Sequence, residues 1–111
     1  MNASIENVLR NPLLEVQSEF LAEYQFQLKD IPVCITIRLY KRLGSDVVEF
    51  RQSHFTHTPV QATRYRTDSS WGESESEALH RAIQTFAPFY EEALRAGHKP
   101  TEKWLLKNDG F

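Results

Sequence analysis

Between residues 19 and 53, apolar and polar positions alternate along the chain, which is typical of strands that bury one face. The alternation predicts one strand over residues 19–28, a second over 33–42 and a third that starts at Val48. Residues 29–32 and 44–46 contain the Pro, Gly and Asp that favour turns between these strands. The third strand should end or bulge at Thr58 and Pro59, and a short strand over residues 62–67 could follow.

The first of these segments fits two structures. Its apolar residues alternate with polar ones, so that a strand would carry five of them on one face: Phe20, Ala22, Tyr24, Phe26 and Leu28. A helix would instead align the apolar residues that stand four apart: Val16, Phe20, Tyr24 and Leu28. The strand is favoured because the alternation has more matches and includes three aromatic residues. Residues 13–18 are compatible with either structure.

A helical period begins after Ser74. Ser74 and Glu77 have the spacing of a capping box, in which the two side chains accept hydrogen bonds from amides at the start of a helix. Apolar residues then recur at steps of three and four: Leu79, Ile83, Phe86, Tyr90 and Leu94. Gly97 favours a left-handed C-cap, and Pro100 cannot continue the helix. The spacing predicts a helix over residues 75–96, with a kink at Pro88 because proline lacks a backbone N–H.

These elements predict an α+β fold, in which a three- or four-stranded antiparallel meander packs one face against the long kinked helix. Apolar residues of both layers should form its centre: Ile35, Ile37, Leu39, Phe50, Leu79, Ile83, Phe86 and Tyr90. Ser4 can cap a short N-terminal helix. The length fits one domain over residues 1–111, with a core at about 14–100 and an apolar tail over 101–111. The tail should dock on the body, or anchor a partner or a second copy, through Trp104, Leu105, Leu106 and Phe111.

The composition is that of a folded protein in a reducing compartment. Hydrophobic residues make up 41% and aromatic residues 12%, which argues against disorder. The single cysteine, Cys34, cannot form an intramolecular disulfide, and its apolar neighbours Val33 and Ile35 predict a packed thiol. The chain shows no signal peptide and no apolar run of about 18 residues. We therefore expect a cytoplasmic protein with no membrane partner.

The residue types needed for catalysis are present without the spacing that catalysis requires. His54 and His57 stand three apart, which on a strand places them on opposite faces and makes them a poor pair of metal ligands. The serines, Asp68 and the four histidines contain no nucleophile motif, and the four glycines form no phosphate-binding loop. We expect neither enzyme activity nor a cofactor. The alternative is a small enzyme or metal-binding protein that uses His54 or His57.

Positive charge is concentrated in the middle of the chain. Residues 38–66 carry a net charge of +4, whereas the segments before and after them each carry −3. The predicted register gathers basic residues and one tyrosine on the sheet face away from the helix: Arg38, Tyr40, Arg42, Arg51, Arg64 and Arg66. Such a face suits an acidic protein partner or, alternatively, RNA or single-stranded DNA. The expected function is that of a non-enzymatic interaction or regulatory module that binds another macromolecule, and we expect that macromolecule to be a protein. Self-association through a sheet edge or through the tail is compatible with this function.

Family resemblances concern the fold. The order helix, three strands, helix resembles the double-stranded RNA-binding domain, whose second helix opens with a glycine and a lysine-rich turn. Here Gly72 precedes an acidic turn over residues 73–77. The run from Gly72 to Leu79 resembles the HicB antitoxin family, in which a meander leads through a glycine and an acidic-alanine-leucine run into one helix. This sequence has neither that family's aspartate-proline segment nor its appended DNA-binding domain, so the resemblance implies the fold alone. Residues 96–105 are similar to small cyanobacterial proteins, which implies no activity.

Overall fold

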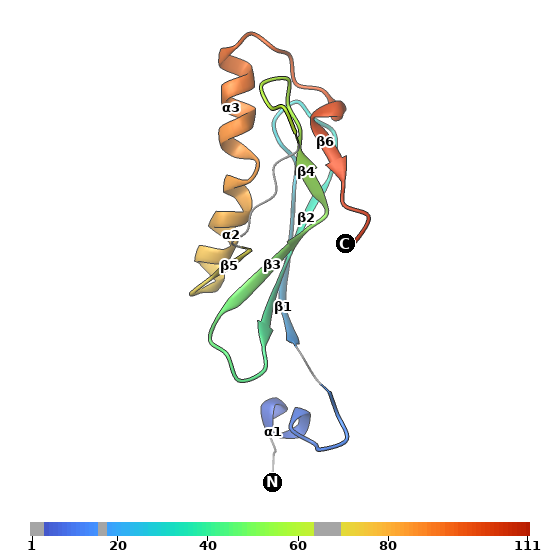
Figure 1. The fold of residues 1–111 in the computed structure, drawn as a ribbon, viewed down its shortest axis with the longest axis vertical. Helices are drawn as coiled ribbons and strands as arrows, with labels where there is room; N and C mark the ends of the chain where they lie inside the picture. Colours follow the sequence, from blue (N-terminus) through green and yellow to red (C-terminus); the bar gives the residue numbers. More distant parts are fainter. Residues whose placement is uncertain (1–3, 16–17, 64–69) are drawn as a thin grey trace.

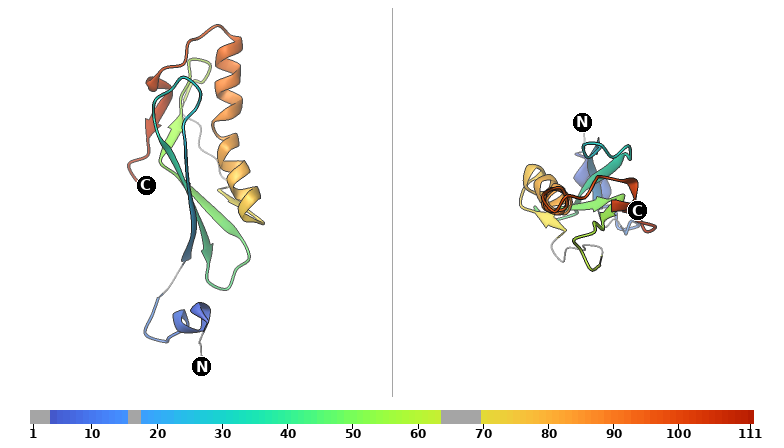
Figure 2. Two further views of the ribbon diagram at one scale, coloured as in Figure 1. Left: turned by 180° about the vertical axis from the view of Figure 1, so that it is seen from behind. Right: turned by 90° about the horizontal axis from the view of Figure 1, so that it is seen from above.

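The computed structural model describes residues 4–15, 18–63 and 70–111, and shows an antiparallel sheet with one bent helix packed on it (Figure 1). Seen from above, the bent helix lies on one side of the strands (Figure 2). This arrangement confirms the predicted α+β class and the predicted packing of a kinked helix on one face of the sheet.

The sheet has four strands in the order β1 (Ser18–Phe26), β2 (Ile35–Arg42), β3 (Val48–Gln52) and β5 (Trp71–Gly72). Beyond β3 the chain continues as β4 (His54–Thr56), which pairs with β6 (Leu105–Lys107) in a separate two-stranded sheet. The third predicted strand is therefore divided between two sheets. Of the strand predicted over residues 62–67, residues 62 and 63 are not in a strand, and residues 64–67 lie outside the described residues.

The predicted face of the first strand is wrong at one position. A β-bulge lies between Phe20 and Ala22, so that Leu21 is an extra residue in the pairing with β2. After the bulge, Ala22 and Phe26 lie on the side of the sheet that meets the helix, whereas Phe20 pairs with Tyr40 on the other side. A shift by one residue moves a side chain to the opposite face, because side chains along a strand alternate with a period of two.

The helix begins as predicted, and its bend lies just before Pro88, where the kink was predicted. The Ser74 hydroxyl accepts a hydrogen bond from the N–H of Glu77 at 3.1 Å, which completes one half of the predicted capping box. The first part, α2 (Glu75–Gln84), is separated from the second, α3 (Ala87–Arg95), by two residues that are not α-helical. Pro88 lies in the first turn of α3, where its missing N–H costs least, so the bend precedes the proline.

The helix approaches the sheet through its smallest residues. Ala78, Ala82 and Ala93 are fully buried, and Phe86 is the largest of the fully buried side chains. Five members of the predicted centre are buried: Ile35, Ile37, Leu39, Phe50 and Phe86. The other three are only partly buried: Leu79, Ile83 and Tyr90. The prediction placed the large residues of the stripe at its centre, whereas the alanines beside them occupy it because they permit a closer contact between the layers.

The two ends of the chain meet the body differently. The helical turn α1 (Ile5–Leu9), capped by Ser4, lies beyond the start of β1 and away from the bent helix (Figure 1). At the other end, the short 3-10 helix η1 (Glu102–Trp104) leads directly into β6, and Trp104 and Leu105 are buried in the core. The apolar tail therefore docks on the body, which was one of its two expected positions.

Candidate functional site

The sheet face opposite the helix carries a row of side chains that crosses all four strands. The register aligns Phe20 with Tyr40, Tyr40 with Glu49, and Glu49 with Trp71. A neighbouring row aligns glutamate with two arginines: Glu23, Arg38 and Arg51. We call the two rows together with Arg42, which follows on the same side of β2, the outer face. Arginine and aromatic residues are the types enriched at interfaces, so this face is the candidate interaction surface.

Aromatic rings and guanidinium groups are in contact across the outer face. The Phe20 ring meets the Tyr40 ring edge to face, with centroids 5.9 Å apart, and Phe20 remains 55% exposed. The Arg51 guanidinium lies 4.7 Å from the Tyr40 ring centroid, and the Arg38 guanidinium lies 4.2 Å from the Phe111 ring centroid. Sequence reasoning missed Phe20 because only the pairing with β2 reveals the bulge.

The arginines of this face are partly neutralised by glutamates. Arg38 donates from Nε to Glu23 at 2.8 Å, and this hydrogen bond raises the pKa of Arg38. Arg42 is paired in the same way with Glu49 at 2.6 Å. Both pairs are substantially exposed, and exposed ion pairs stabilise a fold by only about 0–1 kcal/mol. An external anion could therefore take the place of either carboxylate at small cost. Within the described residues, Arg51 has no carboxylate partner.

The structure brings together only part of the predicted site. Arg38, Tyr40, Arg42 and Arg51 share the outer face, as the predicted strand register required. Arg64 and Arg66 lie outside the described residues. Of the four predicted tail anchors, Trp104 and Leu105 are core residues and Leu106 and Phe111 are half-buried. The tail contributes to the outer face through Phe111, whose ring lies under Arg38.

A cavity of about 280 Å³ opens at the β5 edge of the outer face. Its lining combines an indole ring, an ion pair and small groups: Arg42, Val47, Glu49, Ser70 and Trp71. Arg81 from α2 holds the Trp71 side chain in place, because its guanidinium lies 4.9 Å from the ring centroid and donates to the Trp71 carbonyl at 2.9 Å. The cavity therefore offers a fixed aromatic wall beside a charged pair.

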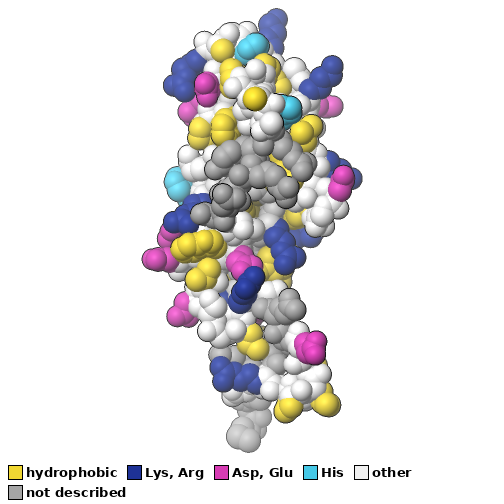
Figure 3. Space-filling view, in the orientation of Figure 1, with side chains coloured by type: hydrophobic (Ala, Val, Ile, Leu, Met, Phe, Trp, Pro, Cys, Tyr) yellow, Lys and Arg dark blue, Asp and Glu magenta, His cyan; other side chains and the backbone are white. Residues whose placement is uncertain are grey.

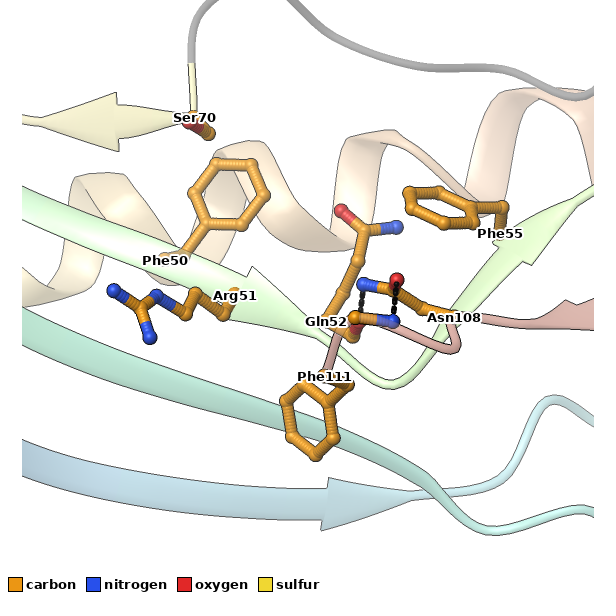
Figure 4. Close-up of a pocket in the computed structure, with 8 residues that line it drawn as sticks. Phe50, Arg51, Gln52, Phe55, Ser70, Asn108 and Phe111 are labelled. Carbon is orange, nitrogen blue, oxygen red and sulfur yellow. Dashed lines mark hydrogen bonds between the residues drawn. The ribbon is translucent and has the colours of Figure 1, made fainter.

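A second cavity, of about 350 Å³, lies along β3 between β5 and β6 (Figure 4). It is lined by Phe50, Arg51, Gln52, Phe55, Ser70, Asn108, Gly110 and Phe111. Its two amides already have partners: Gln52 Nε2 donates to the His54 carbonyl and Asn108 Nδ2 donates to the Gln52 carbonyl, both at 2.8 Å. The charged group that this cavity offers to a ligand is Arg51. Residues from distant parts of the chain form both cavities, so no local pattern in the sequence could reveal them.

The two histidines of the alternative prediction lie in and directly after β4. His54 Nδ1 is 2.7 Å from Ser53 Oγ, and burial, with a smaller effect of Lys107, lowers the pKa of His54. His57 is placed by its backbone, whose N–H donates to the Trp104 carbonyl at 2.8 Å. Within the described residues, no three His, Cys, Asp or Glu side chains gather as a metal ion would require.

The prediction of a packed thiol is wrong, because Cys34 is exposed. Cys34 lies in the connection directly before β2, whose first residue, Ile35, is fully buried. Since neighbouring residues of an extended chain point in opposite directions, the burial of Ile35 turns Cys34 outward.

The N-terminal segment exposes apolar side chains. Eight large hydrophobic residues are exposed in the described part of the chain, and four of these lie within residues 5–14. Their exposed fractions are 67% for Ile5, 57% for Val8, 89% for Leu13 and 47% for Leu14. Hydrophobic side chains are visible at the lower end of Figure 3, where α1 and the following residues lie. We call residues 4–15 the N-terminal arm.

No protein-family model matches the chain, and neither a curated protein nor a solved structure is significantly similar to it. Among the described residues, none of the helices combines the length and the hydrophobicity that crossing a membrane requires.

Proposed function

We propose that this protein is a small, non-enzymatic interaction module that binds another protein through its N-terminal arm. The observation that carries the proposal is the exposure of Ile5, Val8, Leu13 and Leu14 within ten residues. Single exposed apolar residues are common on protein surfaces, but several of them in one short segment mark an interaction site.

The free energy available from burying the N-terminal arm favours a binding mode in which the arm is combined with a second contact. Burying one such side chain from full exposure contributes about 1.5–3 kcal/mol. Because the four are already partly buried, their burial by a partner contributes less than about 6–12 kcal/mol in total. Association costs about 4–15 kcal/mol in lost freedom of motion, so the arm alone would bind weakly. The strand that follows the arm, β1, is an edge strand of the sheet, and its open edge can pair with an extended segment of a partner.

The proposal is tested by site-specific photo-crosslinking. A photoreactive amino acid at position 13 should yield a discrete crosslinked product in a lysate of the cells from which the protein comes, and mass spectrometry then identifies the partner. The same probe at position 91, an exposed site on α3, is the matched control and should give no such product. Identical patterns from both positions, or none from position 13, would contradict the proposal.

A second copy of the chain is one partner that this experiment would identify. Sedimentation equilibrium of the purified protein would then show a dimer, and Leu13→Asp with Leu14→Asp should convert it to a monomer. Because both side chains are exposed and outside the core, this double variant should melt with the wild type.

A further inference from the structure

We infer that the outer face is a second binding surface, which takes single-stranded nucleic acid. The bases would stack on Phe20 and on Trp71, at the two ends of the row Phe20, Tyr40, Glu49 and Trp71, which we call the aromatic row. The phosphates would meet Arg38, Arg42 and Arg51. This surface is separate from the N-terminal arm, so the inference does not depend on a protein partner.

The geometry of the aromatic row fits stacked bases. The row runs from β1 to β5 across four strands that are hydrogen-bonded in the order β1, β2, β3, β5. With strands about 4.8 Å apart, its ends are separated by roughly 14 Å. In RNA-binding domains with a four-stranded sheet, aromatic residues on the sheet stack two or three bases. Phe20 presents an open ring at one end, and at the other the 280 Å³ cavity borders Trp71.

The arginines lie where they can meet a backbone that passes over these rings. Arg38 and Arg51 are paired across β2 and β3 in the row next to the aromatic one, and Arg42 lines the cavity beside Trp71. Arg51 is exposed, and among the described residues it has no carboxylate partner. Its guanidinium is already held over the Tyr40 ring, so less side-chain freedom is lost when it binds an anion.

Acidic residues predominate in the helix layer and arginines on the outer face, as binding of a negatively charged nucleic acid to the outer face requires. The helix layer, residues 73–95, contains five acidic and two basic residues, whereas the outer face has three arginines and two glutamates. The helix packs on one side of the sheet (Figure 2), and the arginines of the outer face lie on the other side, so the acidic residues of the helix layer do not cover them. An overall charge of −2 is therefore compatible with a local anion site.

Fluorescence anisotropy of short labelled RNA and DNA single strands tests the inference. Three neutralised phosphates predict a slope of about −2 in the plot of log affinity against log salt, hence a loss of about 20-fold between about 50 and 200 mM salt. Arg51→Gln should reduce that slope by about 0.7. Phe20→Ser should weaken binding about 5- to 150-fold without changing the slope, because it removes a stacked base and no charge.

Matched controls lie on α3. Arg95→Gln removes an exposed arginine from the acidic layer, and Leu94→Ser removes an exposed apolar side chain, so both should bind as the wild type does. Leu13→Asp, in the arm, should also retain full binding. All variants should keep the wild-type melting temperature. Measuring it shows whether a loss of affinity is due to unfolding.

Three results would overturn the inference. The first is the absence of binding at about 50 mM salt, where electrostatic attraction is strong. The second is an equal loss of affinity in Arg95→Gln and Arg51→Gln, which would indicate nonspecific attraction. The third is full competition by an acidic peptide together with unchanged binding by Phe20→Ser, because the face would then be a dock for an acidic protein.

Discussion

The hydroxyl of Thr56 donates a hydrogen bond of 2.7 Å to the backbone carbonyl of Thr85, at the break between α2 and α3. Both residues are buried, with 1% and 3% of their surface exposed. The carbonyl of Thr85 is one of the helix-end groups that a bend leaves in need of a partner, and β4 supplies that partner from the other layer. Gln52 adds a second link, because its amide donates to the Thr85 hydroxyl at 3.1 Å.

Thr56→Val should therefore destabilise the fold by about 1–3 kcal/mol, because it leaves the Thr85 carbonyl buried without a donor while the size of the side chain hardly changes. Urea denaturation measures the loss. Thr63→Val is the matched control, since Thr63 is exposed and its replacement should change the free energy of unfolding by no more than about 0.5 kcal/mol. Equal losses in both variants would mean that the hydrogen bond to Thr85 contributes nothing.

Gly72→Ala should destabilise the protein by about 1–3 kcal/mol or prevent β5 from pairing. A Cβ atom at Gly72 would lie 2.5 Å from the backbone N of Ala78, in a place where neither main chain can move independently. Gly110→Ala is the comparison, because its Cβ would make an ordinary contact at 3.5 Å. Thermal melting of the two variants measures the difference. Equal melting temperatures for Gly72→Ala and Gly110→Ala would contradict the close approach of β5 to α2.

Phe86→Ala should cost about 3–5 kcal/mol, because the ring is fully buried and is in edge-to-face contact with Phe26 at 6.2 Å. Ile83→Ala should cost less, since Ile83 is only half-buried. Leu94→Ala, at a residue 42% exposed, should be close to neutral. Denaturation midpoints in this order would support the packing of the bent helix, and an equal cost at positions 83 and 86 would contradict it.

The stability of the fold should fall as the pH drops below about 6.5. The pKa of His54 is lowered from its ordinary value of 6.5, mainly by burial, so the unfolded chain takes up a proton before the folded chain does. Neutral His54 therefore makes a contribution to stability that is fully present above pH 6.5, and this contribution is lost as the pH falls toward the pKa of His54 in the folded state. The free energy of unfolding of His54→Asn should vary less than that of the wild type between about pH 7.5 and pH 5.5. Equal slopes would show that His54 titrates identically in both states.

A chain that ends at Lys103 should be less stable by at least about 3 kcal/mol, because it lacks the buried Trp104 and Leu105 and the strand that pairs with β4. Replacing the exposed Asp109 by Ala is the control within the same tail. Circular dichroism and thermal melting report the loss. An unchanged melting temperature of the shortened chain would mean that β6 does not stabilise the fold, so that the residues of β6 are available to bind a partner.

Local interactions explain why some elements could be predicted from the sequence. The Ser74 cap, the bend before Pro88 and the end at Gly97 each depend on residues within one or two turns of one another. At the C-terminus, Gly97 has a φ of +88°, and His98 N–H donates to the Ala93 carbonyl at 3.0 Å, which is the expected left-handed cap. The alternation of β2 is equally local, and it placed Arg38, Tyr40 and Arg42 on one face correctly.

Contacts between distant residues decided the rest. The sequence by itself determined the α+β class, the helix ends and the buried side of β2, because period and capping are properties of neighbouring residues. Only the tertiary structure determined that Phe20 faces outward, since a bulge is defined by the partner strand. It likewise decided that alanines rather than Ile83 meet the sheet, and that Glu23 and Glu49 reach the arginines, because these outcomes depend on which surfaces the fold brings within contact distance.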